Sequence, residues 1–210
     1  NRNLRLNYYA VKALQARFYL YTNQTEKAYE AASAVYTAQP ANLSSTNDFN
    51  NQYNATPSEC LFALSNHELM DYAISVLGMG SNQVQSTHYF ISLQMMNDLY
   101  EGVDISTHAG YGQLWNTATM DGSGDYTKAL LKKYYYDTKG EYSATALLNK
   151  LQIIPMLRMS EIYLIMMETT TDLDEANTLY VEYMQARSVN VSETFSSLDE
   201  VKDFVVGEIR

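Results

Sequence analysis

The sequence is poor in cysteine, proline, glycine and positive charge, and these shortages exclude several classes of protein. The single cysteine, Cys60, cannot form an internal disulfide, and its apolar neighbours indicate a buried thiol. Three prolines and nine glycines among 210 residues favour helices. With 14 basic and 24 acidic side chains the net charge is −10, which repels the phosphate backbone of nucleic acids. We therefore expect no nucleic acid partner.

Long apolar runs are also missing. No run approaches the roughly 18 apolar residues that a membrane-spanning helix needs. The first ten residues have neither the apolar core nor the cleavage site of a signal peptide, so we expect any export signal to have been removed. The content of 46% hydrophobic and 18% charged residues is that of an ordered globular domain and excludes a disordered chain.

Residues 1–40 are expected to form a first helical hairpin resembling a tetratricopeptide repeat (TPR). Two antiparallel helices are predicted between residues 7 and 38, joined by the polar turn Thr22, Asn23, Gln24, with Thr25 as the N-cap of the second helix. Small and aromatic residues recur at TPR spacing, and these residues are Ala16, Tyr19, Ala28, Val35 and Pro40.

Residues 151–210 are expected to form a second TPR-like hairpin and a terminal helix. Pro155 is predicted to open the hairpin as the first helical residue, and Asp174 to cap the return helix. The aromatic and alanine pattern of the first hairpin returns at Tyr163, Ala176, Tyr180 and Tyr183. The last apolar stripe consists of Leu198, Val201, Val205 and Ile209. Because it is still periodic at Arg210, we expect the helix to continue beyond this residue.

Residues 41–150 are expected to form a long loop-rich insertion with one short strand and one helix. The strand is predicted at Cys60 to Leu64. An apolar stripe of Tyr89, Leu93, Met96 and Tyr100 predicts a helix that ends near Gly102. Loop follows as far as Gly124. The predicted fold class is thus mostly α, with TPR-like hairpins and little strand. The tyrosines assigned to helix packing are Tyr8, Tyr19, Tyr163, Tyr180 and Tyr183.

Motifs for catalysis, metals and cofactors are incomplete. His67 and Glu68 begin a zinc motif whose second histidine is replaced by Asp71, which favours a solvated histidine. The DGSGD run at 121–125 begins like a calcium loop but lacks its glycine and its bidentate glutamate. We therefore expect no catalytic residue, metal or cofactor.

Aromatic residues flank or occupy the glycine-rich stretch from 102 to 124. A sugar ring can stack on an indole or phenol ring while neighbouring polar groups bind its hydroxyls. The candidate ligand-binding residues are Trp115, Tyr111, Tyr100, Tyr126 and Asp104. Alternatively, Trp115 anchors a long loop to the core without contacting a ligand.

Three segments of the sequence match motifs of one protein family. RLNYYAVKALQARFYLYTNQTEKAYEAASAVY is similar to the first repeat of the SusD/RagB family, and SECLFALSN to the strand that follows it. IIPMLRMSEIYLIMMETT resembles the signature P-x-x-R-x-S-E-x-Y-L-x-x-A-E, with Met167 in place of its alanine. The residues that match this signature are Pro155, Arg158, Ser160, Glu161, Tyr163, Leu164 and Glu168. Arg158 and Glu161 are expected to pair with each other or to bridge to a neighbouring helix.

The resemblance implies a SusD-like α-helical fold and a non-catalytic binding protein. Family members are lipid-anchored at the extracellular face of the outer membrane of Bacteroidetes, where they bind oligosaccharides and deliver them to a TonB-dependent (SusC-like) transporter. They are longer than this chain, so residues 1–210 are expected to be a single domain or part of a larger one, without the lipid-bearing cysteine. A TPR-like scaffold that binds peptides or proteins stays open as an alternative. A glycoside hydrolase ranks third and would need two carboxyl groups roughly 5 to 9 Å apart.

Overall fold

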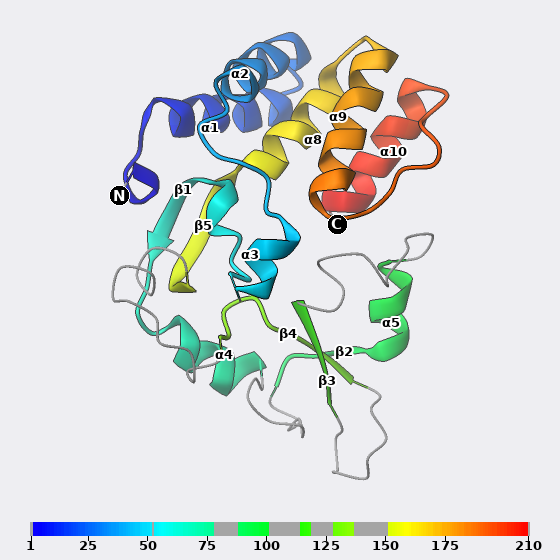
Figure 1. Ribbon diagram of the computed structural model, residues 1–210. Helices are drawn as coiled ribbons and strands as arrows, with labels where there is room; N and C mark the ends of the chain where they lie inside the picture. The colour runs from blue at the N-terminus through cyan, green and yellow to red at the C-terminus, as the bar shows by residue number, and fades with distance from the viewer. Residues whose placement is uncertain are drawn as a thin grey trace.

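The computed structural model describes residues 2–51, 53–77, 88–100, 114–118, 128–136 and 151–209. The longer helices lie together on one side of the molecule, and short strands and helices lie on the other (Figure 1). The longer helices are α1 (Tyr8–Tyr21), α2 (Thr25–Ala38), α8 (Met159–Thr169), α9 (Leu173–Ala186) and α10 (Leu198–Ile209). The shorter helical elements are η1 (Arg2–Leu4), α3 (Thr46–Asn50), η2 (Pro57–Glu59), α4 (Leu69–Leu77) and α5 (Leu93–Asp98).

Two small antiparallel sheets connect these helices. Strand β1 (Cys60–Ser65) pairs with β5 (Ile153–Arg158), which joins segments about ninety residues apart in the chain directly beneath α1 and α8. The second sheet has the order β2-β4-β3, with β2 (Ile91–Ser92), β4 (Lys128–Leu131) and β3 (Trp115–Ala118). The strand predicted at Cys60 to Leu64 is therefore confirmed.

The first predicted hairpin consists of α1 and α2, which pack against each other. Asn7 begins α1 because its side-chain oxygen accepts a hydrogen bond from the backbone N–H of Ala10 at 3.1 Å. The turn follows at Thr22 to Gln24, with Asn23 in the left-handed region at φ 57°. The predicted cap was wrong, because Thr25 is already the first residue of α2 and Gln24 precedes it without a side-chain cap.

The prediction that Pro155 opens a helix was wrong. Pro155 lies in β5 opposite Ala63 of β1, and the helix α8 begins four residues later at Met159. A proline has no N–H to donate to a ladder, so it is tolerated in a two-stranded sheet, in which each strand has an open edge. The predicted return helix is present as α9, but its N-cap is Asp172 rather than Asp174. The Asp172 side chain accepts from the backbone N–H groups of Asp174 and Glu175.

The helix predicted through Tyr89 and Tyr100 is shorter than expected. Residues 91 and 92 form strand β2, and Ser92 then caps α5 by accepting from the backbone N–H of Met95 at 3.0 Å. Met96 of the predicted stripe is buried, but Tyr89 precedes the helix and is 72% exposed. Because Ile91 and Ser92 pair with β4, the chain just before Leu93 is a strand rather than the first part of the predicted helix.

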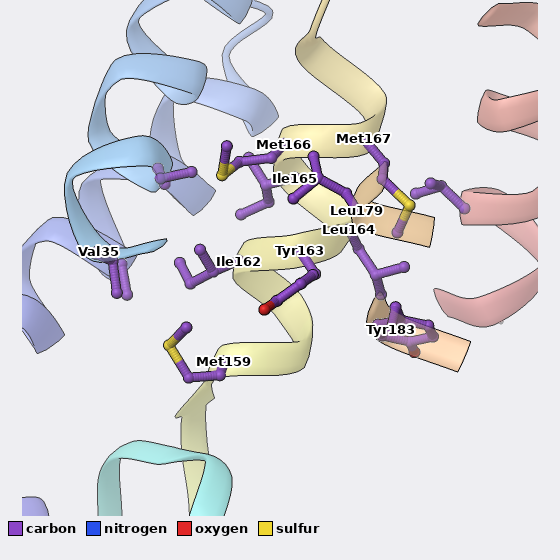
Figure 2. Packing of buried hydrophobic residues seen from close by; sticks show 14 of the residues in the cluster. Val35, Met159, Ile162, Tyr163, Leu164, Ile165, Met166, Met167, Leu179 and Tyr183 are labelled. Carbon is purple, nitrogen blue, oxygen red and sulfur yellow. The ribbon is translucent and has the colours of Figure 1, made fainter. Parts of the chain in front are cut away.

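The main hydrophobic core surrounds α8. One side of α8 carries Ile162 and Met166 toward Val35 of α2, and the opposite side carries Leu164 and Met167 toward α9 and α10 (Figure 2). Burial of each such side chain contributes about 1.5–3 kcal/mol. The terminal amphipathic helix was predicted correctly, since Val201 and Val205 of α10 are fully buried in the same core. Helix α8 is thus the central element to which the other long helices attach.

Tyr8 is a further correction, because it does not pack in the core. Tyr163 and Tyr183 are buried, and Tyr19 and Tyr180 are partly buried against the core, but Tyr8 is 64% exposed. It occupies the first position of α1, whose buried residues are the small side chains Ala10, Ala13 and Ala16. Five large apolar side chains of α1 are exposed, namely Tyr8, Val11, Leu14, Phe18 and Tyr21, whereas Tyr9, Tyr19 and Leu20 pack against the core.

Candidate functional site

Two of the five predicted ligand-binding residues meet in the structure. The indole Nε1–H of Trp115 donates a hydrogen bond to the hydroxyl of Tyr100 at 3.0 Å, and both side chains are half-buried. Tyr111, Tyr126 and Asp104 lie outside the described residues. The sequence proximity of Tyr100 and Trp115 therefore corresponds to a direct contact between their side chains.

Trp115 lies on a strand rather than in the predicted loop. It begins β3, at one edge of the three-stranded sheet, where it is opposite Leu131 of β4. The backbone N–H of Lys132 also donates to the carbonyl of Leu114 at 2.7 Å, which extends this pairing. The neighbouring strand is held to the protein by Leu130, which is fully buried. A ring on such a paired strand is positioned more firmly than a ring on a free loop, which suits a stacking platform.

Tyr100 is positioned by α5. This helix is capped by Ser92 and held by buried Met96. Tyr100 lies in the turn that follows the helix, and its backbone N–H donates to the carbonyl of Asn97 at 3.0 Å. Exposed apolar side chains lie on and beside the same helix, namely Tyr89, Met95 and Leu99, at 72%, 56% and 61% exposure. Met95 and Leu99 were missed by the sequence analysis because they lie off the predicted stripe, although their i, i+4 spacing places them on one helix face. The Trp115 and Tyr100 pair thus lies near further apolar surface.

Tyrosine and glutamate side chains link the two hairpins. The Tyr29 hydroxyl donates to Glu175 at 2.6 Å, and the hydroxyls of Tyr36 and Tyr163 donate to one oxygen of Glu182 at 3.0 and 3.1 Å. The hydrogen bond to Glu175 raises the pKa of Tyr29 to about 12, while burial and the Glu182 bond raise the pKa of Tyr36 to about 12. These phenols are neutral donors at physiological pH. We assign them to the packing of α2 on α8 and α9.

Glu161 forms the bridge to a neighbouring helix that was one of the two expectations for it. Its carboxylate accepts from Nε and Nη2 of Arg17 on α1, at 2.5 and 2.6 Å. Arg158, the other residue of that expectation, has no ion pair with Glu161. It lines a cavity of about 490 Å³ at the start of α8.

Two residues considered for reactivity have structural or solvated positions. Cys60 is 1% exposed, and burial raises the pKa of its thiol to about 12, so it is inert as expected. His67 is exposed, with its Nε2 atom 3.8 Å from an oxygen of the equally exposed Glu68. The position of His67 is that of the solvated histidine we expected. His108 and the 121–125 run lie outside the described residues.

A second, acidic cavity of about 740 Å³ lies where the N-terminal part of α2 meets the turn between α8 and α9. Its lining includes four carboxylates and a run of three threonines. The residues are Glu26, Tyr29, Glu30, Thr169, Thr170, Thr171, Asp172 and Glu175. Glu175 already accepts from Tyr29 and from the Thr170 hydroxyl, so part of this charge is used within the protein.

The fold is that of SusD-like proteins. The structure is similar to that of a SusD superfamily protein from Bacteroides thetaiotaomicron, with TM-score 0.71 and 23% identity over 98% of this chain and 47% of that one. A SusD-like carbohydrate binding protein from Bacteroides vulgatus matches with TM-score 0.66 and 18% identity over 99% of this chain and 43% of that one. A protein solved with a xylogluco-oligosaccharide matches with TM-score 0.67 and 18% identity over 99% of this chain and 49% of that one.

These comparisons confirm the predicted fold class, a mostly helical SusD-like fold with TPR-like hairpins. The chain spans just under half the length of each of these three structures. By sequence, neither a protein-family model nor a curated protein matches it. Among the described residues, no helix combines the length and apolar character that crossing a membrane requires.

Proposed function

We propose that this chain is part of a SusD-like protein that binds oligosaccharides at the cell surface and catalyses no reaction on them. The contact between Trp115 and Tyr100 carries the proposal, because it fixes an indole ring on a sheet edge beside exposed apolar side chains. Such a ring offers a face for the C–H groups of a pyranose. The fold supports the proposal, since one structure with this fold is described as carbohydrate binding and another was solved with a xylogluco-oligosaccharide.

The proposal extends to the whole protein. We propose that it belongs to the SusD/RagB family, that residues 1–210 are part of one larger domain, and that a lipid outside this chain anchors it to the extracellular face of the outer membrane. It passes its sugar to a TonB-dependent (SusC-like) transporter. The likeness of fold supports these statements.

Fluorescence of Trp115 tests sugar binding directly, because it is the only tryptophan. The chain is titrated with a panel of plant, host and microbial oligosaccharides, including xyloglucan fragments. We expect a saturable change with at least one sugar, and calorimetry with Trp115→Ala should show about a tenfold loss of affinity, the equivalent of about 1.4 kcal/mol of stacking.

Tyr21→Ala is the matched control, because Tyr21 is 90% exposed on α1 and an aromatic ring is removed there too. It should bind as the unmodified chain does. A flat response to every sugar in both fluorescence and calorimetry, or equal losses in the two variants, would make Trp115 a structural anchor and contradict the proposal.

The peptide-binding alternative is favoured by a different observation, the acidic cavity between α2 and the turn of α8 and α9. Its carboxylates would attract the basic side chains of a peptide. Such binding weakens as salt screens the charges, whereas stacking of a neutral sugar changes little. A lysine-rich peptide whose affinity falls steeply between 50 and 500 mM NaCl, and falls further with Glu30→Gln, would support this alternative.

A further inference from the structure

The cavity that Arg158 lines gathers positive charge, although the chain as a whole is acidic. It lies where the N-terminal end of α8 meets the C-terminal ends of α9 and α10, and its volume is about 490 Å³. Three of the six arginines in the sequence line it, namely Arg17, Arg158 and Arg187. Two glutamates, Glu161 and Glu208, lie there too. Trp115 is not part of its lining, so the cavity is separate from the site proposed above.

The charges of the three arginines are compensated to different degrees. Arg17 is paired with Glu161 through two hydrogen bonds. Arg187 donates one N–H to the carbonyl of Tyr183 at 3.0 Å, and its guanidinium carbon lies 3.5 Å from the centroid of the Tyr183 ring. Within the described part of the chain, Arg158 has neither a hydrogen bond from its guanidinium nor an ion pair. As far as the described residues show, the cavity therefore offers the guanidinium of Arg158 without a partner and several unpaired N–H donors of Arg187.

Ser160 provides an independent indication that the cavity binds a ligand. This residue lines the cavity and is only 3% exposed, yet its hydroxyl has no hydrogen-bond partner among the described residues. Buried hydroxyls are almost always paired, so an unpaired one calls for a partner that the described residues do not supply.

The start of α8 adds a further attraction for an anion. Arg158 is the N-cap residue and makes no side-chain cap, so its side chain does not satisfy the backbone N–H groups of the first helical turn. These groups carry the positive end of the helix dipole, which favours a negatively charged ligand. The charge of Arg158 also affects Lys133, whose pKa is lowered by burial and by the repulsion of Arg158.

We infer that this cavity binds a carboxylate-bearing sugar, a uronic acid, with the carboxylate between Arg158 and Arg187 and a ligand oxygen at the Ser160 hydroxyl. A guanidinium presents parallel N–H donors that match the two oxygens of a carboxylate. The cavity is much larger than a bare anion requires and falls within the roughly 300–1,000 Å³ of small-ligand sites. The identification of the ligand as a sugar rests on the proposed function, whereas the carboxylate specificity rests on the cavity itself.

Glucuronate is the probe, and glucose is its neutral counterpart. Calorimetry should show binding of glucuronate that weakens with added salt, and glucose should bind at least tenfold more weakly. The Nε–H signals of Arg158 and Arg187 in nitrogen–proton spectra should shift with glucuronate. Arg158→Gln should weaken glucuronate binding about tenfold or more, and Ser160→Ala severalfold. Arg5→Gln removes an exposed arginine outside the cavity and should leave binding unchanged.

Separate outcomes distinguish this inference from the proposed function. Trp115→Ala should leave glucuronate binding intact, and Arg158→Gln should leave the fluorescence response to neutral oligosaccharides intact. Equal binding of glucuronate and glucose, or equal losses in Arg158→Gln and Arg5→Gln, would overturn the inference. Acetate or N-acetylglutamate amide binding as tightly as glucuronate would overturn its sugar part. If Arg158→Gln does not fold by circular dichroism, Arg187→Gln and Ser160→Ala give the decisive comparison with Arg5→Gln.

Discussion

Arg17 of α1 and Glu161 of α8 are 144 positions apart in the sequence, yet they form a bidentate ion pair. Nε and Nη2 of Arg17 donate to the two carboxylate oxygens of Glu161, and Nη2 also donates to the carbonyl of Met156 in β5 at 2.7 Å. One guanidinium thus joins the first hairpin, the strand β5 and the helix α8. Glu161 belongs to the segment that resembles the family signature, and Arg17 to the segment that resembles the first repeat.

A double-mutant cycle on Arg17→Ala and Glu161→Ala measures the strength of this pair. Both side chains are partly exposed, at 44% and 27%, so solvent screens the attraction. We expect a coupling free energy of about 1 kcal/mol from urea unfolding, falling as NaCl is raised. A coupling free energy near zero at low salt would show that the pair orients the two elements without stabilising the fold.

The tyrosine hydroxyls that bind Glu175 and Glu182 predict a loss of stability in alkali. The folded-state pKa values of Tyr29 and Tyr36 are raised from 10.0 to about 12, so folding favours the protonated phenol. This contribution is fully present below pH 10, where the unfolded chain is also protonated, and is lost as pH rises through 12. The free energy of unfolding, measured with denaturant, should therefore be lower at pH 11 than at pH 9.

Phe variants isolate these two tyrosines. Tyr29→Phe and Tyr36→Phe should each lower the free energy of unfolding at pH 7 by about 0.5–1 kcal/mol, because each removes one partly solvated hydrogen bond to a carboxylate. They should also reduce the fall between pH 9 and pH 11. Tyr21→Phe, at an exposed position, is the control. An unchanged pH dependence in both variants would contradict the assignment of the raised pKa values.

Truncating the buried side chains of α8 should strongly lower the free energy of unfolding. Ile162 and Met166 are each 1% exposed and face α2 (Figure 2). Ile162→Ala or Met166→Ala should lower the free energy of unfolding by about 2–5 kcal/mol through lost burial and a residual cavity. Ile74→Ala on α4, where the side chain is 45% exposed, should change it by less than about 0.5–1 kcal/mol. Similar losses at the two kinds of site would contradict the placement of the core around α8.

Tyr100→Phe tests the contact with Trp115 without removing a ring. The change deletes the hydroxyl that accepts the indole N–H at 3.0 Å. The half-buried indole should then donate its hydrogen bond to water, so its emission maximum and its quenching by acrylamide should both change. Tyr89→Phe, which removes the hydroxyl of a tyrosine that is 72% exposed, should leave both unchanged. Identical spectra for all three proteins would show that the contact does not form in solution.

Much of the helical half could be predicted from local sequence. Polar turns and apolar periodicity are local signals, so the turn at Asn23, the hairpin of α1 and α2, and the stripe of Val201 and Val205 were all found correctly. The family resemblance led to the SusD-like fold, which the structural comparisons confirm. Trp115 and Tyr100 were both candidates, although their mutual hydrogen bond could not be predicted.

What tertiary structure decided is which face of an element is buried and which segments pair. The exposed apolar side chains of α1 follow the helical periodicity expected of a buried face, and so do its alanines. Only the alanines are small enough to let α2 approach and pack. Pro155 suits a helix start by local rules, yet pairing with Ala63 makes it part of a strand. Trp115 likewise lies on a strand because β4 supplies its hydrogen bonds. The sequence by itself determined where most helices form and which fold they belong to. Pairing and burial between distant segments, which no local pattern encodes, decided the rest.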